Sequence, residues 1–283
     1  MRRLLAEIAR RPASLIATIV ILLVVATAIA ASWIAPFSPD DQPFDGLSVE
    51  GAPLPPGAHY WLGTDTLGRD LLSRLLFGAR TSLVIGLVAN GVAVAIGVAV
   101  GIVAGYRSGF IGGALMRFTD LMMAFPALLL AIVLAALLHP SLWIVAMVIA
   151  LVNWVQVARV IYTETRGLAE RDFILAERSL GAGHARILLR HIAPHLMPTA
   201  IVYGTLGIAT TVLLEATLSF LGVGVQPPLP SWGNIIFESQ SYFQSAPWLV
   251  FIPGAIILAT ALSFNLLGDA LRDIFDPTQR GRG

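Results

Sequence analysis

The chain has 283 residues, of which 57% are hydrophobic and only 12% charged, about half the charged share of roughly 25% in a typical soluble domain. All 18 basic residues are arginine, and the chain has neither lysine nor cysteine, so a G-x-x-x-x-G-K-[ST] phosphate loop, a lysine Schiff base, disulfides and thiolate metal sites are excluded. A net charge of +1 gives no case for nucleic-acid binding, and the composition predicts an integral membrane protein.

Charge-free runs indicate the membrane-spanning helices, because a helix needs about 20 mostly apolar residues to cross the hydrocarbon layer. Four long runs contain no Asp, Glu or Arg, and the third, between Asp120 and Arg159, holds 38 residues, enough for two crossings. His139-Pro140 is the expected turn within it. A fifth run contains one acid, Glu215. The pattern predicts an all-α membrane protein with six transmembrane helices, at about 13–36, 81–106, 120–138, 141–160, 198–222 and 247–268.

The chain divides into two regions and has a clear charge bias. Residues 1–80 hold the first helix and an outer loop, and residues 81–283 hold the other five helices and a cytoplasmic loop at 162–197. With both termini inside, 15 of the 18 arginines are cytoplasmic, as the positive-inside rule requires. The first helix could instead be a cleaved secretory signal, but the 22 residues Ala13–Ile34 exceed a signal core of roughly 7 to 15, which favours a retained anchor.

Two local patterns indicate packing. Leucines at helical spacing between Leu67 and Phe77 predict a short helix, which either lies on the outer membrane surface or packs on the spans. In the second span small residues recur every four positions, which predicts close contact with a helix of this chain or of a partner. These small residues are Ala89, Ala93, Gly97, Gly101 and Gly105.

The longest cytoplasmic loop contains a short helical pattern. Asp172 is a candidate N-cap, and Gly181 or Gly183 is a candidate end. Such a helix needs something to cover its apolar face, either lipid or a groove on a soluble partner. The residues expected on that face are Phe173, Ala176 and Leu180.

Two further polar features are weighed for function. His191 and His195 stand four residues apart, but Pro194 separates them and no acid or cysteine is close in sequence, so no metal site is expected. Glu215 is a functional candidate because an acid inside a span is costly. It lies 17 residues beyond Pro198, about 26 Å along a helix and so near the outer end. Structural pairing and a place in a transport path both remain open.

Four stretches resemble the permease subunits of ATP-binding cassette importers, specifically the second permease of the dipeptide and oligopeptide group. They are Leu62–Leu83, Asp120–Pro126, Ser219–Asn234 and Arg272–Pro277. The resemblance spans nearly the whole chain, and the Gln-Pro-Pro to Trp-Gly part of the third stretch is highly specific. It implies the type I importer permease fold.

The cytoplasmic loop is similar to the family's E-A-A-x-x-x-G loop, which docks on the ATPase subunit. The matching positions are Ala176, Arg178, Gly181 and Pro194. The chain departs from the pattern at Leu175, where the family has glutamate, and at Glu177, where it usually has alanine. Two residues correspond to a rotation of about 200° on a helix, so the acid of this loop is expected to face elsewhere.

The resemblance implies a pore-forming subunit that moves dipeptides or oligopeptides from an extracytoplasmic binding protein into the cytoplasm by alternating access. Its implied partners are a homologous permease in a heterodimer, two ATP-binding subunits, the binding protein and the lipid of the inner (plasma) membrane. The chain itself is expected to have no catalytic residue and no cofactor, with ATP and Mg bound by the ATPase subunits. Candidate path residues are Asn153, Gln156, Glu215, Ser219 and Asn265, and candidate binding-protein contacts are Gln226, Pro227, Trp232 and Gly233.

Other functions are weighed against this one. Related permeases carry nickel or other small cargo, so the substrate class stays open. An ion-coupled secondary transporter predicts acids or histidines near the membrane midplane and inverted repeats, neither of which is evident. A membrane-embedded enzyme would need a nucleophile–base pair, paired carboxylates or a metal cluster in the spans, and the sequence suggests none.

Overall fold

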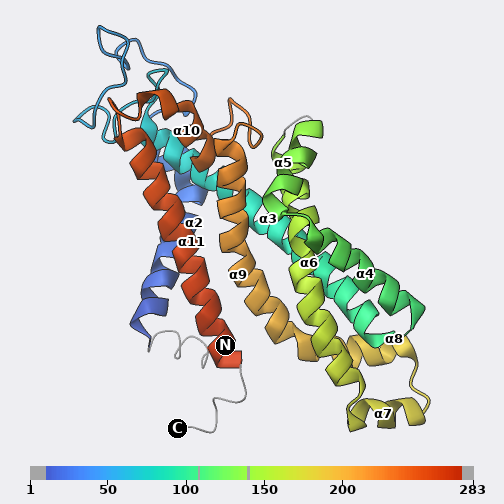
Figure 1. Cartoon of the computed structure of the whole chain (residues 1–283). Helices are drawn as coiled ribbons and strands as arrows, with labels where there is room; N and C mark the ends of the chain where they lie inside the picture. Colours follow the sequence, from blue (N-terminus) through green and yellow to red (C-terminus); the bar gives the residue numbers. More distant parts are fainter. Residues whose placement is uncertain (1–10, 108, 139–140, 276–283) are drawn as a thin grey trace.

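The computed structural model describes residues 11–107, 109–138 and 141–275, and within these ranges long helices form the body of the molecule (Figure 1). Five of them are long and apolar enough to cross a membrane, and a bent pair, α4 and α5, makes up to six. The five are α2 (Pro12–Ile34), α3 (Leu71–Tyr106), α6 (Leu142–Ala169), α9 (Ala193–Phe220) together with the helical turns that precede it from His184, and α11 (Trp248–Phe275). The shorter helices are α4 (Phe110–Ala124), α5 (Ala127–Leu137), α7 (Asp172–Ser179), α8 (His184–Ile187) and α10 (Trp232–Glu238).

The third expected span differs most from the sequence prediction. It begins at Phe110 rather than near residue 120 and is bent by 88° between α4 and α5. The break falls at Phe125-Pro126, where Phe125 is extended (φ −85°, ψ 134°) because a residue before proline is disfavoured in the helical region. The turn expected at His139-Pro140 lies outside the described residues.

Helix α3 is longer than the predicted second span. Asp70 caps its first turn by accepting a hydrogen bond from the Ser73 N–H at 2.8 Å, and the helix then continues for 36 residues, about 54 Å. The short helix expected at Leu67–Phe77 is therefore not a separate helix on the membrane surface, because most of it forms the first turns of α3, packed through Leu71 and Leu75. The predicted boundary at residue 80 falls inside α3.

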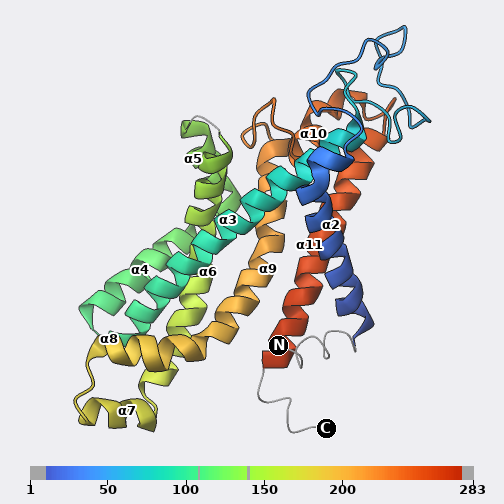
Figure 2. The same ribbon diagram turned by 180° about the vertical axis from the view of Figure 1, so that it is seen from behind.

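The small-residue stripe of α3 packs on α6 of the same chain. A Cβ atom added at Gly101 would lie 2.7 Å from the Ala158 carbonyl oxygen and 2.8 Å from Ile161 Cβ, too close for any side chain. Gly97 and Gly105 approach α6 equally closely. Figure 2 shows α3 crossing α6 along this contact. The neighbour that the sequence left open is thus an intramolecular one.

The ends of the helices define two faces. The loop between α2 and α3 and the helix α10 lie at one end, whereas α7 and α8 lie at the other (Figures 1 and 2). Helix α2 begins, and α11 ends, on the side of α7. There an ion pair joins Arg11, just before α2, to Asp273 in α11. Helix α9 packs on α11, α3 and α6.

Candidate functional site

The short helix α7 has a well-defined end. Gly181 adopts φ +80°, its N–H donates to the Arg178 carbonyl, and the Ala182 N–H donates to the Glu177 carbonyl, both at 3.0 Å. This is a Schellman motif, in which glycine is favoured because it takes positive φ without strain. The prediction that a glycine ends the helix is confirmed at Gly181. Asp172 does not cap the helix; it is the first helical residue, after Arg171.

Helix α7 buries one apolar residue against the rest of the protein and leaves most of its other apolar residues exposed. Ile174 is fully buried in a cluster that includes Ile187, Ile192 and Leu196. The face predicted to need a partner is open, with Leu180 85% exposed. The exposed set on and beside this helix is Phe173, Leu175, Ala176 and Leu180. Ile174 was not predicted to be buried, although its place among these apolar residues is a signal that one of them had to face inward.

The ends of α3, α7 and α8 are linked by three side chains. The Arg178 guanidinium lies over the Tyr106 ring, 4.9 Å from its centroid. The Tyr106 hydroxyl lies 3.0 Å from Nδ1 of His184 in α8. Because Tyr106 is the last residue of α3, these contacts join α7 and α8 to the end of a long helix of the bundle. Nothing in the sequence pattern indicated this link.

The residues that depart from the family motif point in different directions. The Glu177 carboxylate faces its own chain, with Oε1 at 3.4 Å from His191 Nε2, whereas Leu175 is exposed. The expectation that the acid faces elsewhere agrees with this geometry. Pro194 lies in the first turn of α9, directly after the π-helical turn Leu188–Ile192 that joins α9 to α8. His195 stacks on Phe173.

No metal centre is visible in the part of the chain that the structure describes, because no three His, Asp or Glu side chains there are placed to hold an ion. Nδ1 of His195 is hydrogen-bonded to the His191 carbonyl at 2.6 Å. The two histidines therefore take part in local packing contacts of the loop.

Glu215 is fully buried between α9 and α3. The Ser82 hydroxyl donates to its Oε2 at 2.9 Å, and the Ser219 hydroxyl donates to its Oε1 at 2.8 Å. The two serines in turn accept backbone N–H groups, Ser82 from Trp232 at 3.4 Å and Ser219 from Val225 at 3.1 Å. This arrangement favours structural pairing over contact with a substrate for both Glu215 and Ser219.

The other path candidates are spread over two helices. Asn153 on α6 is half-buried, and its Nδ2 donates to Thr211 Oγ1 on α9 at 3.3 Å. Gln156 on α6 and Asn265 on α11 are exposed. The structure therefore leaves Gln156 and Asn265 as the predicted path residues with accessible side chains.

The predicted binding-protein contacts separate into two pairs. Gln226 and Pro227 are exposed in the loop before α10. Trp232 is only 1% exposed, and its Nε1 donates to the Leu75 carbonyl at 3.2 Å. A Cβ at Gly233 would lie 2.5 Å from the Ala216 carbonyl oxygen. The prediction is wrong for Trp232 and Gly233, because both pack α10 against α3 and α9.

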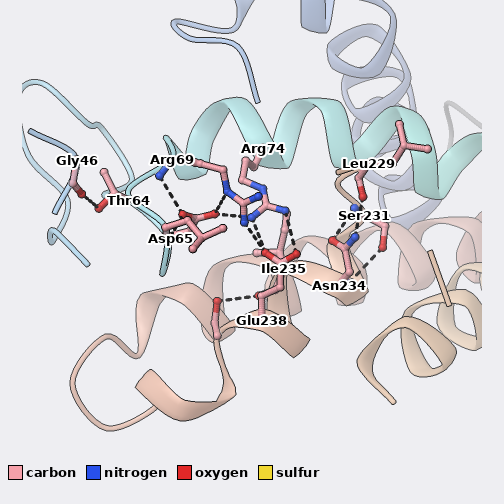
Figure 3. A network of polar contacts seen from close by, with 12 residues as sticks. Gly46, Thr64, Asp65, Arg69, Arg74, Leu229, Ser231, Asn234, Ile235 and Glu238 are labelled. Atoms are coloured by element: carbon pink, nitrogen blue, oxygen red, sulfur yellow. Dashed lines mark hydrogen bonds and ion pairs between the residues drawn. The ribbon is translucent and has the colours of Figure 1, made fainter. Parts of the chain in front are cut away.

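A neutral cluster of two arginines and two acids joins the outer loop to α10 (Figure 3). Arg69 Nε lies 2.6 Å from Asp65 Oδ2, and Arg69 NH2 lies 2.6 Å from Glu238 Oε2. Arg74 bridges the same two carboxylates. The sequence showed arginines accompanied by acids in the outer loop, but it gave no sign of Glu238 as the shared partner, because that residue lies far along the chain.

Comparisons with known proteins agree with this architecture. Residues 97–281 match the model of the family described as binding-protein-dependent transport system inner membrane component. Residues 1–56 match the model of the N-terminal transmembrane domain of oligopeptide transport permease C.

Similar proteins include named permeases. The dipeptide transport system permease protein DppC of Escherichia coli (strain K12) is 43% identical, covering 95% of this chain and 90% of its own. The di/tripeptide transport system permease protein DppC of Pseudomonas aeruginosa (strain UCBPP-PA14) is 39% identical over 90% and 85%. The glutathione transport system permease protein GsiD of Shigella flexneri serotype 5b (strain 8401) is 40% identical over 96% and 88%.

Among solved structures, one showing inward facing conformations of the MetNI methionine ABC transporter superposes with a TM-score of 0.58 at 17% identity, covering 70% of this chain and 95% of the other. The similarity shows that the two chains share the fold of an importer permease.

Proposed function

The chain belongs to the family of binding-protein-dependent transport system inner membrane components, and on that premise we propose that it forms the pore of an ATP-driven dipeptide or oligopeptide importer, with α7 as its contact with the ATPase. As a permease component it is not an enzyme, and the ATPase is a separate subunit. Its place is the inner membrane.

The observation that carries the proposal is the exposure of α7. Only Ile174 of this eight-residue helix is buried, whereas Leu175 and neighbouring apolar residues are open. An apolar helix face outside the spans is stabilised when a groove on another protein covers it. The helix also contacts the end of α3 through Arg178 and Tyr106. Movement of the covering subunit would therefore be passed to the bundle.

The proposed topology places α7 and both chain termini in the cytoplasm. The arginine bias supports this orientation, and the described ends of α2 and α11 lie on the side of α7 (Figure 1). The outer loop, α10 and the exposed Gln226 and Pro227 then face a binding protein. In this assembly the chain pairs with a homologous permease above two ATP-binding subunits.

Transport in this proposal is a change between inward-open and outward-open states. ATP and the loaded binding protein shift the equilibrium only to the extent that they bind the two states with different affinity. The candidate lining residues with accessible side chains are Gln156 and Asn265. Peptide cargo follows from the relatives named for dipeptides and di/tripeptides, and glutathione, itself a small peptide, is the substrate in the name of a third.

The test is uptake by the purified importer complex in sealed vesicles. Labelled dipeptides, tripeptides, glutathione and Ni²⁺ are supplied outside the vesicles together with the binding protein. ATP is enclosed inside the vesicles, on the side of the membrane where the ATPase subunits lie. We expect ATP-dependent accumulation of a peptide and none with an ATPase subunit that cannot hydrolyse ATP. Uptake driven by an ion gradient without ATP would support a secondary transporter, and ATP-dependent uptake of Ni²⁺ alone would replace the peptide assignment.

A further inference from the structure

A cavity of about 360 Å³ lies where the ends of α3 and α6 meet the beginning of α4 and the side of α7. Ligand pockets have volumes of roughly 300–1,000 Å³, so the cavity is large enough for a small group. One wall carries no side chains, since it is formed by Gly109, Gly112 and Gly113. The charged side chains that line it are Arg107, Arg166, Arg178 and Glu170.

The positive charge of this cavity is largely uncompensated. Glu170 Oε1 lies 3.9 Å from Arg166 Nε, and this is an exposed pair of the kind that contributes little. Arg178 rests on the Tyr106 ring. Within residues 11–107, 109–138 and 141–275, neither Arg107 nor Arg178 has a carboxylate at ion-pair distance. Three guanidinium groups around one hollow attract an anion, and their planar N–H groups suit phosphate oxygens.

The cavity continues into an apolar surface. A second hollow shares Tyr106, Arg107 and Arg178 with the first and extends to Phe110 and Ile111 at the start of α4. Phe110 is 91% exposed and Ile111 45% exposed. A small water-soluble anion makes no use of these two side chains. A phospholipid would contact both hollows, because its charged phosphate suits the arginine-lined cavity and its acyl chains suit the exposed Phe110 and Ile111.

The position of the cavity fits a lipid of the membrane surface. It lies at the ends of α3 and α6, two candidate spans, on the side that carries α7. Basic pockets between transmembrane helices on the cytoplasmic side bind anionic lipid headgroups. We propose that this cavity binds the phosphate group of an anionic phospholipid through Arg107 and Arg166, with Phe110 and Ile111 beside the acyl chains. The proposal rests on the topology given under "Proposed function".

The experiment measures retention of phosphatidylglycerol by the complete importer complex. The complex is purified, placed in nanodiscs of phosphatidylcholine with a minor share of phosphatidylglycerol, re-extracted, and analysed for bound lipid by mass spectrometry. The test variant is Arg107→Gln/Arg166→Gln, and the matched control is Arg117→Gln/Arg186→Gln, which removes the same charge from exposed positions that do not line the cavity. Thermal stability and subunit stoichiometry are recorded for each.

We expect the test variant to need roughly thirtyfold more phosphatidylglycerol for the same occupancy, since it removes two basic side chains that each contribute about 1 kcal/mol near an anionic surface and about 1.4 kcal/mol corresponds to tenfold. The control variant should retain the lipid as the wild type does. Added inorganic phosphate in the millimolar range should displace little of the lipid, because it lacks the apolar contacts.

Three results would overturn the proposal. Equal retention by both variants would mean that the cavity does not hold the lipid. Displacement by inorganic phosphate would assign the site to a soluble anion. Loss of ATPase subunits from the test variant with unchanged lipid retention would place the arginines in a protein interface. Lipid retention needs no transport, so failed peptide uptake by the wild type would contradict the proposed function and leave this measurement valid.

Discussion

The Arg74 guanidinium on α3 and the Glu238 carboxylate at the end of α10 are 164 residues apart in sequence and joined by a hydrogen bond of 2.6 Å between NH1 and Oε2. The pair is largely buried. Arg74 also forms an ion pair with Asp65, and Glu238 forms one with Arg69. It attaches the outer loop and α10 to the first turns of α3. The cluster therefore sets the shape of the surface that faces a binding protein in the proposed assembly.

Replacing Glu238 with Gln should destabilise the protein by about 3–5 kcal/mol, because it leaves two buried arginines with a single carboxylate, Asp65. Thermal unfolding of the detergent-solubilised complex measures this. Glu50→Gln is the matched control, since Glu50 is exposed and the described residues show no ion pair for it. Equal melting temperatures for the two variants would contradict the structural role of the cluster.

Glu215→Gln tests whether the buried acid is a packing group. Glutamine offers one acceptor oxygen where the carboxylate accepts from two serines, Ser82 and Ser219, so one hydroxyl loses its partner. We expect a loss of about 1–3 kcal/mol in stability with proportionate loss of uptake. A double-mutant cycle with Ser82→Ala should show a coupling of at least about 0.5 kcal/mol. If uptake and melting temperature both match the wild type, Glu215 is neither a path residue nor an important packing group.

Gly101→Ala should separate α3 from α6. The added Cβ would lie 2.7 Å from the Ala158 carbonyl oxygen, a backbone atom that cannot turn aside, and overpacking of this kind costs about 1–3 kcal/mol. Gly91→Ala on the same helix is the control, because its Cβ would have no neighbour within 4 Å. In the control, better helix propensity should raise stability by up to about 1 kcal/mol. Equal effects of the two substitutions on the melting temperature would disprove the tight contact.

Gly181→Trp should uncouple ATP hydrolysis from peptide uptake while leaving the subunit in the membrane. A Cβ at Gly181 has open space within this chain, so the internal cost is limited to the positive φ, on the order of 1–2 kcal/mol. The tryptophan side chain would therefore clash mainly with the subunit that covers α7 in the proposed assembly. Gly183→Trp is the control, with φ −68° and the same open surroundings.

The readouts for this pair are ATPase activity and uptake by the reconstituted complex. We expect Gly181→Trp to reduce uptake severalfold more than it reduces ATP hydrolysis, and Gly183→Trp to keep a higher ratio of uptake to hydrolysis. Unchanged uptake in Gly181→Trp would disprove the assignment of α7 as the ATPase contact.

Several features were predictable from the sequence because they depend on neighbouring residues. Most spans were found from charge-free runs, and the end of α7 was found from Gly181, since both run length and left-handed backbone are local properties. The break at Phe125-Pro126 was missed although the proline that favours it is visible in the sequence. A proline in an apolar run is tolerated in many membrane helices, so the bend depends on which neighbours satisfy the freed backbone groups.

The sequence by itself determined the class of the molecule, its apolar spans and the existence of one short helix outside them. Only the tertiary structure decided that Glu215 is buried against Ser82 of α3, that Trp232 and Gly233 are buried, and that the glycine stripe packs on α6. Those outcomes depend on contacts between residues far apart in the chain, such as Ser82 with Glu215 across 133 positions. Periodicity and composition carry no record of such pairings, because burial is set by the surfaces that folding brings together.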